Sequence, residues 1–411
     1  MMHFLSDFPD NNELLQWWQK NQTERNHKVN CHIHTPFSFS AFDDIRQPFE
    51  MAVKEDIKVL GINDFFVADG YEAFHENAVY HLIFPEFNIE FIGLLAEEQK
   101  SGIRVNDPNN PGRTYFSGKG LNYPFGVSSR YVQKLEQVKA ESQKQVQMML
   151  LKTNELLKHI KAPFSFDFER LKKEFAKGLV RERHIAKAIR VRLHEHFNCR
   201  SEKISFLEKL YAGKEHKADI DDHTRLEEEI RGNLLKAGGL AYIPEDENAF
   251  LPVPEIIEII IDAGGIPCYP VLLDDKNGNY TGFEEDHQRL ADRLAGLGVG
   301  CVELIPGRNR FENLIRFVRY MENRGFVVIF GTEHNTPQLM PLTLKASDKQ
   351  LDPYLEKVAY EGACIVAAHQ YLKCRGEEGF IDENGLAKTG RRTEFSILGK
   401  AVIEKYLSEN Q

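Results

Sequence analysis

Strand-like and helix-like segments alternate in two separate parts of this 411-residue chain. The first part covers residues 29–95, the second covers residues 249–411, and a stretch with little strand character lies between them. Alternating strands and helices are typical of βα units, in which parallel strands pair and helices cover the sheet. We therefore expect an α/β fold, a distorted seven-stranded (β/α) barrel of TIM type with a large helical insertion.

The predicted elements follow from apolar periodicity and turn residues. In the first part the strands are expected at 29–33, 58–62 and 81–84, and the helices at 47–56 and 71–80. In the second part the strands are expected at 265–273, 299–305 and 326–330, and the helices at 254–262, 283–297, 310–324, 351–372 and 394–407. Six or seven strands are fewer than the eight of the standard barrel.

Residues 96–248 are interpreted as a helical insertion that caps the barrel. Residues 101–124 are rich in Gly, Pro and Asn and are predicted as loop. Helices are predicted at 129–160, 167–177, 180–196, 201–211 and 222–236. Residues 1–28 form an N-terminal leader, whose helix at 10–20 should pack against the outside of the main domain.

Composition narrows the class of protein. With 52 basic and 62 acidic side chains the net charge is −10, which disfavours a dedicated nucleic-acid binder. No apolar run is long enough for a bilayer, and the N-terminus lacks the basic start and apolar run of a signal peptide. The six cysteines have no paired CxxC spacing. We expect a cytoplasmic protein with reduced thiols. The negative net charge does not exclude a local basic pocket for a small anionic metabolite as partner.

His32 and His34 lie at the carboxyl end of the first predicted strand. Alternate residues of a strand point to the same side, so the two imidazoles should point in the same direction. Barrel enzymes keep their sites at this end of the strands, and two neutral imidazoles can hold Zn, Mn or Fe. An isolated His-x-His also occurs as an ordinary packing or surface pair.

Further ligand-type residues lie at or near the ends of later predicted strands. They are Asp64, Glu86, Glu90, Glu303, Glu333 and His334. Each alone would also suit a helix cap or a loop salt bridge. Because strand ends converge on one cleft in a barrel, together they predict a metal centre.

Several short segments resemble the PHP (polymerase and histidinol phosphatase) superfamily. At the front they are His-Ile-His-Thr-Pro-Phe-Ser (32–38), Gly-Ile-Asn-Asp (61–64) and Phe-Pro-Glu-Phe-Asn-Ile-Glu (84–90). Near the back they are Ala-Gly-Gly-Ile-Pro (263–267), the Val-Glu strand at 302–303 and Gly-Thr-Glu-His-Asn (331–335). The resemblance implies a seven-stranded barrel, a cluster of up to three divalent metals and hydrolysis of phosphate esters.

The resemblance assigns metal ligation to particular positions. These are His32, His34, Asp64, either Glu86 or Glu90, Glu333 and His334. Phe65 stands where the family has a histidine, and Tyr269 replaces the histidine of a His-Pro pair. Such departures mark a divergent member with incomplete motifs, for which one to three ions of Zn, Mn or Fe are expected.

Catalytic roles are expected for three side chains. His34 or His334 would carry a proton if it is not itself a ligand, and Tyr269 would donate a hydrogen bond to a substrate oxygen. A bound divalent ion would activate water and polarise a phosphoryl or carbonyl oxygen.

Basic residues give candidate substrate contacts. Arg181 and Arg183 begin a predicted helix, where an anion would be favoured, and Arg113 and Lys119 lie in the predicted loop beside the barrel mouth. Glu303 is a further candidate contact. A solvated charge run and a plain surface loop are the competing interpretations.

The leading hypothesis is a metal-dependent hydrolase, a phosphoesterase acting on a small phosphorylated metabolite. A second is a metal-assisted sugar-acid enzyme, such as an isomerase, a lactonase or an aldolase-like enzyme. A third is a barrel of this kind that has lost catalysis and acts as a binding module.

Overall fold

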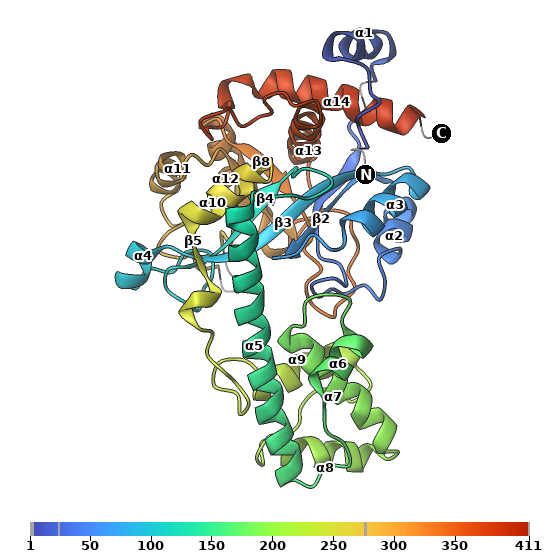
Figure 1. Ribbon diagram of the computed structural model, residues 1–411, viewed down its shortest axis with the longest axis vertical. Coiled ribbons are helices and arrows are strands. Elements are labelled where there is room, and N and C mark those ends of the chain that lie inside the picture. Colours follow the sequence, from blue (N-terminus) through green and yellow to red (C-terminus); the bar gives the residue numbers. More distant parts are fainter. Residues whose placement is uncertain (1–3, 24, 275–277, 410–411) are drawn as a thin grey trace.

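The computed structural model describes residues 4–23, 25–274 and 278–409 (Figure 1). In this part of the chain, seven strands form one curved sheet in the order β1-β2-β3-β4-β6-β7-β8. Their bounds are Lys28–Ile33, Ile57–Phe65, Phe84–Leu94, Arg113–Lys119, Ile266–Val271, Cys301–Leu304 and Val327–Phe330, and a short β5, Leu251–Pro252, pairs with β3. A bridge from Ile33 to Glu333 joins the two edges, so the barrel is nearly closed.

One strand of the barrel runs against the others. β1, β2 and β3 are parallel to one another, as are β6, β7 and β8, but β4 is antiparallel to both β3 and β6. The loop predicted at 101–124 is therefore wrong at 113–119. Pairing along both edges stabilises this strand among the Gly, Pro and Asn residues that favour loop.

The third strand is displaced from its prediction. A strand was expected at 81–84, but β3 begins at Phe84 and continues to Leu94. Its polar residues Glu86, Asn88 and Glu90 are all buried and face the barrel interior. They lie within the strand and not after its end, where the prediction had placed Glu86 and Glu90. Polar side chains in a fully buried strand obscure the apolar run by which such a strand is recognised.

The helices around the barrel lie where periodicity predicts them, within a few residues. They are α2 (Gln47–Glu55), α3 (Tyr71–His81), α10 (Val253–Asp262), α11 (His287–Gly296), α12 (Phe311–Asn323) and α13 (Pro353–Cys374). A short helix that was not predicted, α4, covers Ala96–Lys100. Local capping explains several starts: the side chains of Asp286 and Asp352 accept hydrogen bonds from the first-turn amides of α11 and α13.

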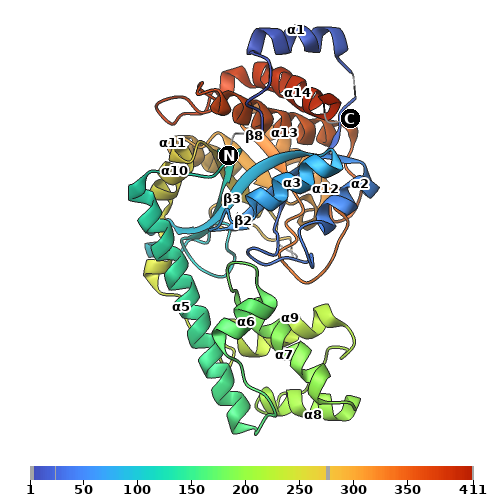
Figure 2. The ribbon, with the colours of Figure 1, turned by 45° about the vertical axis from the view of Figure 1, so that its right-hand side comes forward.

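Two further helices cover α13 on the side away from the helical insertion. α14 (Arg392–Glu409) packs along α13, and α1 (Asn11–Asn21) lies outermost on α14 (Figures 1 and 2). Leu14 and Trp18 of α1 are buried, and the assignment of residues 1–28 to a separate leader stays a prediction.

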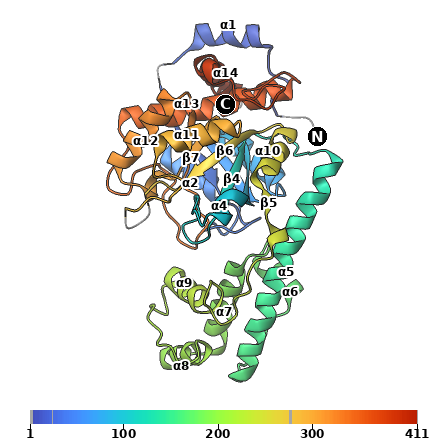
Figure 3. The same ribbon diagram turned by 90° about the vertical axis from the view of Figure 1, so that its left-hand side faces the viewer.

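A separate group of helices lies on the other side of the barrel (Figure 3). It consists of α5 (Ser129–His159), α6 (Phe168–Phe175), α7 (Glu182–His196), α8 (Arg200–Leu210) and α9 (His223–Leu234), which have an apolar cluster of their own. The Leu179 amide donates to the Phe37 carbonyl at 2.8 Å, so this segment contacts the loop that follows β1. The helical insertion is thus confirmed, and the division of the chain at 96 and 248 stays a prediction.

Within residues 4–23, 25–274 and 278–409, no helix combines the length and the apolar character that crossing a bilayer requires.

The contact between α13 and α14 gives a first prediction. A Cβ at Gly399 would overlap the carbonyl oxygen of Cys364 on α13, whereas Gly232 of α9 has open space around it. We expect Gly399→Ala to lower the free energy of unfolding by about 1–3 kcal/mol, measured by urea denaturation. Gly232→Ala is the matched control and should raise it by about 0.5–1 kcal/mol. Equal stability of the two variants would contradict the close packing.

Candidate metal centre

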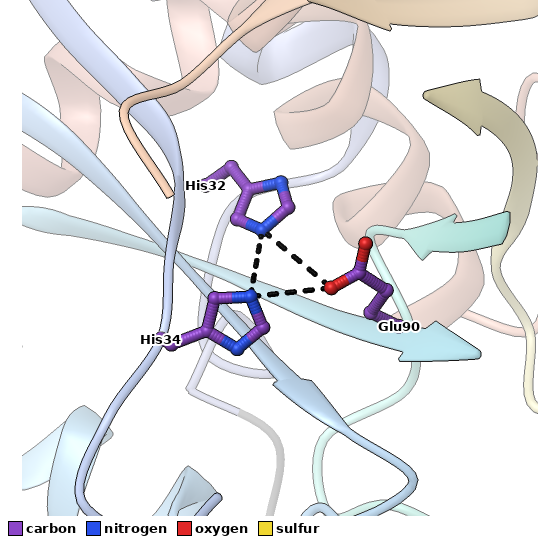
Figure 4. A group of neighbouring side chains, drawn as sticks. All are labelled: His32, His34 and Glu90. Atoms are coloured by element: carbon purple, nitrogen blue, oxygen red, sulfur yellow. Dashed lines mark hydrogen bonds and ion pairs between the residues drawn. The ribbon is translucent and has the colours of Figure 1, made fainter. Parts of the chain in front are cut away.

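Three buried side chains meet inside the barrel mouth: His32 and His34 from the end of β1 and Glu90 from β3 (Figure 4). The Nε2 atoms of the two histidines are 3.2 Å apart, and Glu90 Oε2 lies 3.2 Å from His34 Nε2 and 4.0 Å from His32 Nε2. Strand alternation explains the pairing of the histidines, while β3 reaches them across β2.

The spacing of these three atoms suits a metal ion. Metal bonds of about 2.0–2.2 Å place neighbouring donor atoms roughly 3–3.5 Å apart. Glu90 Oε2 is buried and has no hydrogen-bond partner among the described residues. Three electron-rich atoms that face one another in a buried space are stabilised by a shared cation, so the residues present fit a divalent metal.

Glu303 on β7 sets the tautomer of His32. Its Oε2 lies 3.0 Å from His32 Nδ1. Burial alone would raise the pKa of Glu303, but His32 and Lys119 outweigh burial and lower it to about 2, so the group is ionised. A carboxylate only accepts, so His32 Nδ1 carries the proton and its Nε2 lone pair faces His34 and Glu90.

Asp64 supports His34 indirectly. The Ser38 hydroxyl lies 3.4 Å from His34 Nδ1 and donates to Asp64 Oδ1 at 2.7 Å. The amide of Thr35 also donates to Asp64 Oδ1 at 2.7 Å, and the Thr35 hydroxyl donates to the other oxygen. Asp64 was expected as a ligand; the structure places it behind His34, at 3.9 Å from Nδ1, and outside the three-residue group.

Burial controls the protonation of the centre. It lowers the pKa of both His32 and His34, which favours the neutral imidazole that binds metals. It raises the pKa of Asp64 to about 7 despite the hydrogen bonds that Asp64 accepts. It also raises the pKa of Glu90 to about 7. A cation at the centre would favour the ionised form of Glu90.

Phe65 takes the place of an expected histidine and packs on the centre. Its ring stacks on His34 with the centroids 4.7 Å apart, and the Arg181 guanidinium lies 4.8 Å from the Phe65 centroid. Arg181 occupies the position before the first residue of α7, so the helical segment brings a positive charge to the mouth of the barrel.

Four predicted site residues lie apart from the group. Glu86 is deeper on β3, and Tyr269 donates its hydroxyl proton to Glu284 at 2.7 Å. Glu333 forms an ion pair with Arg308. Both ring nitrogens of His334 already have partners, Thr332 Oγ1 and the Met340 carbonyl oxygen, each at 2.8 Å. Of the two glutamates that the sequence left open, the structure brings Glu90 to the histidines.

The predicted basic residues have different surroundings. Arg113 pairs with Glu245, and Arg183 pairs with Glu228. Lys119, expected in a loop, lies at the end of β4 inside the barrel, and its Nζ is 2.5 Å from Glu303 Oε1. Local sequence could not place Lys119, because the strand that carries it was not recognised.

A cavity of about 280 Å³ opens beside the centre. His32, Glu90 and Glu303 form part of its wall, and Arg308 and Glu333 line it as well. Sequence reasoning missed two polar residues that join this arrangement: Arg308 and Asn63, whose Nδ2 lies 3.0 Å from His32 Nε2. Asn63 could have been found from the sequence, because it is a polar residue within the largely apolar segment 59–67.

No protein-family model matches the chain, and no curated protein matches it. A solved structure of a candidate metal-dependent phosphoesterase from Bifidobacterium adolescentis is similar over 79% of this chain and 94% of its own, with a TM-score of 0.51 and 15% identity. An amidohydrolase from Chromobacterium violaceum is similar over 77% and 92%, with a TM-score of 0.49 and 11% identity. At such low identity the first likeness shows the barrel fold alone.

Glu86 gives a prediction for pH. Burial raises its pKa to about 8 and outweighs the opposing effects of the neighbouring Cys31, Lys119 and Asn88 side chains. The folded state then keeps a proton that the unfolded chain loses above about pH 4.5, so rising pH costs stability up to about pH 8. Glu86→Gln cannot ionise, and its stability relative to the original protein should rise over this window by at most ~1.4 kcal/mol per pH unit.

Urea denaturation at several pH values between about 5 and 8 measures this difference. Glu155→Gln, on the exposed face of α5, is the control and should show a difference that does not change with pH. A constant difference for Glu86→Gln as well would contradict the assignment of a raised pKa to Glu86.

Proposed function

We propose that this protein is a metal-dependent hydrolase, and specifically a phosphoesterase that acts on a small phosphorylated metabolite. The observation that carries the proposal is the buried group His32, His34 and Glu90 at the carboxyl end of barrel strands. The barrel fold shared with a candidate metal-dependent phosphoesterase, and the resemblance of segments 32–38 and 84–90 to the PHP superfamily, support it.

His32, His34 and Glu90 would hold the divalent ion, with Zn, Mn and Fe as the candidates. When bound, such an ion lowers the pKa of a coordinated water and polarises a phosphoryl oxygen. Glu303 and the Ser38–Asp64 pair keep the two imidazoles oriented with Nε2 toward the centre. The cavity beside the centre gives a small substrate access while restricting the surrounding water.

Arginines at the mouth suit an anionic substrate. Arg308 lines the cavity and pairs with Glu333, and Arg181 lies over the Phe65 ring that stacks on His34. Guanidinium groups recognise phosphate through charge-assisted hydrogen bonds. We therefore retain a small anionic metabolite as the proposed partner of a cytoplasmic enzyme, and nucleic acid is disfavoured by the net charge of −10.

Removal of a ligand tests the metal centre directly. We expect His34→Ala to weaken binding of Mn²⁺ or Zn²⁺ by more than about 100-fold, since outer-sphere changes alone cost roughly 10–100-fold. Hydrolysis of an aryl phosphate should be lost in parallel. Metal content by mass spectrometry and phosphate release are the measurements, and His159→Ala, at the exposed end of α5, is the matched control.

Each result of this test separates the hypotheses. Metal-dependent phosphate release that fails only in His34→Ala supports the phosphoesterase. A metal-loaded protein that opens sugar lactones but leaves phosphate esters intact would favour the sugar-acid enzyme. A protein that binds no divalent metal would overturn the proposal and leave the non-catalytic binding module.

Arg181 tests the role of the helical segment. Arg181→Met removes a charge at the mouth, so KM for the phosphate ester should rise about 10-fold with metal content unchanged. Arg170→Met removes an exposed charge of α6 in the same segment and should leave KM unaltered. An unchanged KM in Arg181→Met would exclude this arginine from substrate binding.

A further inference from the structure

A lysine lies buried beneath the candidate metal centre. The side chain of Lys119 is completely inaccessible to solvent, and that of Glu303 is 1% exposed. The ammonium Nζ lies 2.5 Å from Glu303 Oε1 and 3.3 Å from Asn63 Oδ1. A buried ammonium is retained only where such acceptors compensate the loss of water, so this cation is a fixed part of the barrel interior.

Glu303 joins this lysine to the metal centre. One of its oxygens contacts Lys119, and the other contacts His32 Nδ1 at 3.0 Å and accepts from the Ser117 hydroxyl at 3.3 Å. Both oxygens therefore already have partners. Glu303 reaches the centre only through His32, in contrast to Glu90, whose Oε2 faces both histidines.

The oxygens around the ammonium are the kind that a divalent cation would bind. Glu303 Oε1 and Asn63 Oδ1 contact Lys119, and Ser117 Oγ adjoins the same carboxylate. Carboxylate, amide and hydroxyl oxygens suit Mg²⁺ or Mn²⁺. A second ion among them would lie next to a buried positive charge, where repulsion is poorly screened.

We propose that the Lys119 ammonium takes the place of a second metal ion, so that the centre holds a single divalent ion on His32, His34 and Glu90. This rests on the proposed metal-dependent function and adds the number of ions to it. Lys119 is then a positioning residue: it neutralises Glu303, and Glu303 holds the His32 ring with Nε2 toward the ion.

Manganese is the probe, because its stoichiometry and its electron paramagnetic resonance spectrum can both be measured without turnover. The metal-free protein is titrated with Mn²⁺, and bound metal is counted by mass spectrometry after removal of free ions. We expect about one Mn²⁺ per chain with the spectrum of an isolated ion.

Lys119→Met removes the charge and keeps a similar length of side chain. It leaves Glu303 Oε1 without the lysine charge, while His32 and Ser117 still contact Oε2, so the buried carboxylate attracts a replacement cation. Binding should rise to about two Mn²⁺ per chain, with the spectrum of a magnetically coupled pair. The double variant Lys119→Met with Glu303→Gln has neither charge, and its stoichiometry should return to about one.

Different results overturn different claims. Two coupled ions in the original protein would overturn the single-ion proposal and leave the metal-dependent function standing. The same holds if a folded Lys119→Met, verified by circular dichroism, still binds one ion. No bound ion in the original protein would overturn the proposed function and this inference with it. If Lys119→Met does not fold, the count and spectrum of the original protein still decide the question.

Discussion

The ion pair between Lys119 and Glu303 sits in the interior of the barrel, and the polar centre is built outward from it. Glu303 holds His32 by Nδ1, and the other nitrogen of that ring faces His34 and Glu90. Charged groups in a buried space must be paired, because an isolated buried charge costs more than folding can supply. Lys119 therefore constrains the orientation of Glu303, and Glu303 constrains the orientation of His32 within the His-His-Glu group.

The helical segment completes the mouth of the barrel from outside. Backbone contact between Leu179 and Phe37 places the start of α7 beside the loop that follows β1. Arg181 then lies over Phe65, and Phe65 lies against His34. A segment with its own apolar cluster thus adds a positive charge near the centre without adding a metal ligand. In the proposed function, the barrel holds the metal ion and this segment contributes a charge that contacts the substrate.

Three residues that depart from the motifs expected from the PHP resemblance have other partners in the structure. The Phe65 ring stacks on His34, Tyr269 donates its hydroxyl proton to Glu284, and His334 bonds within its own loop. None of these three joins His32, His34 and Glu90. Lys119 instead supplies a positive charge in the same interior. In the proposed single-ion centre these three residues contribute no ligand, and the Lys119 ammonium supplies the second positive charge.

Local sequence was enough to predict all the described α-helices except the short α4, the alternation of βα units and the shared face of His32 and His34. Those features depend on periodicity and capping within a few residues, as the Asp352 cap at the start of α13 illustrates. Tertiary structure alone decided that 113–119 is a barrel strand, that Glu90 rather than Glu86 meets the histidines, and that Asp64 supports His34 from behind. It also decided that Lys119 lies inside the barrel and pairs with Glu303. These outcomes depend on strand pairing and charge compensation between residues far apart in the chain, which no local pattern encodes.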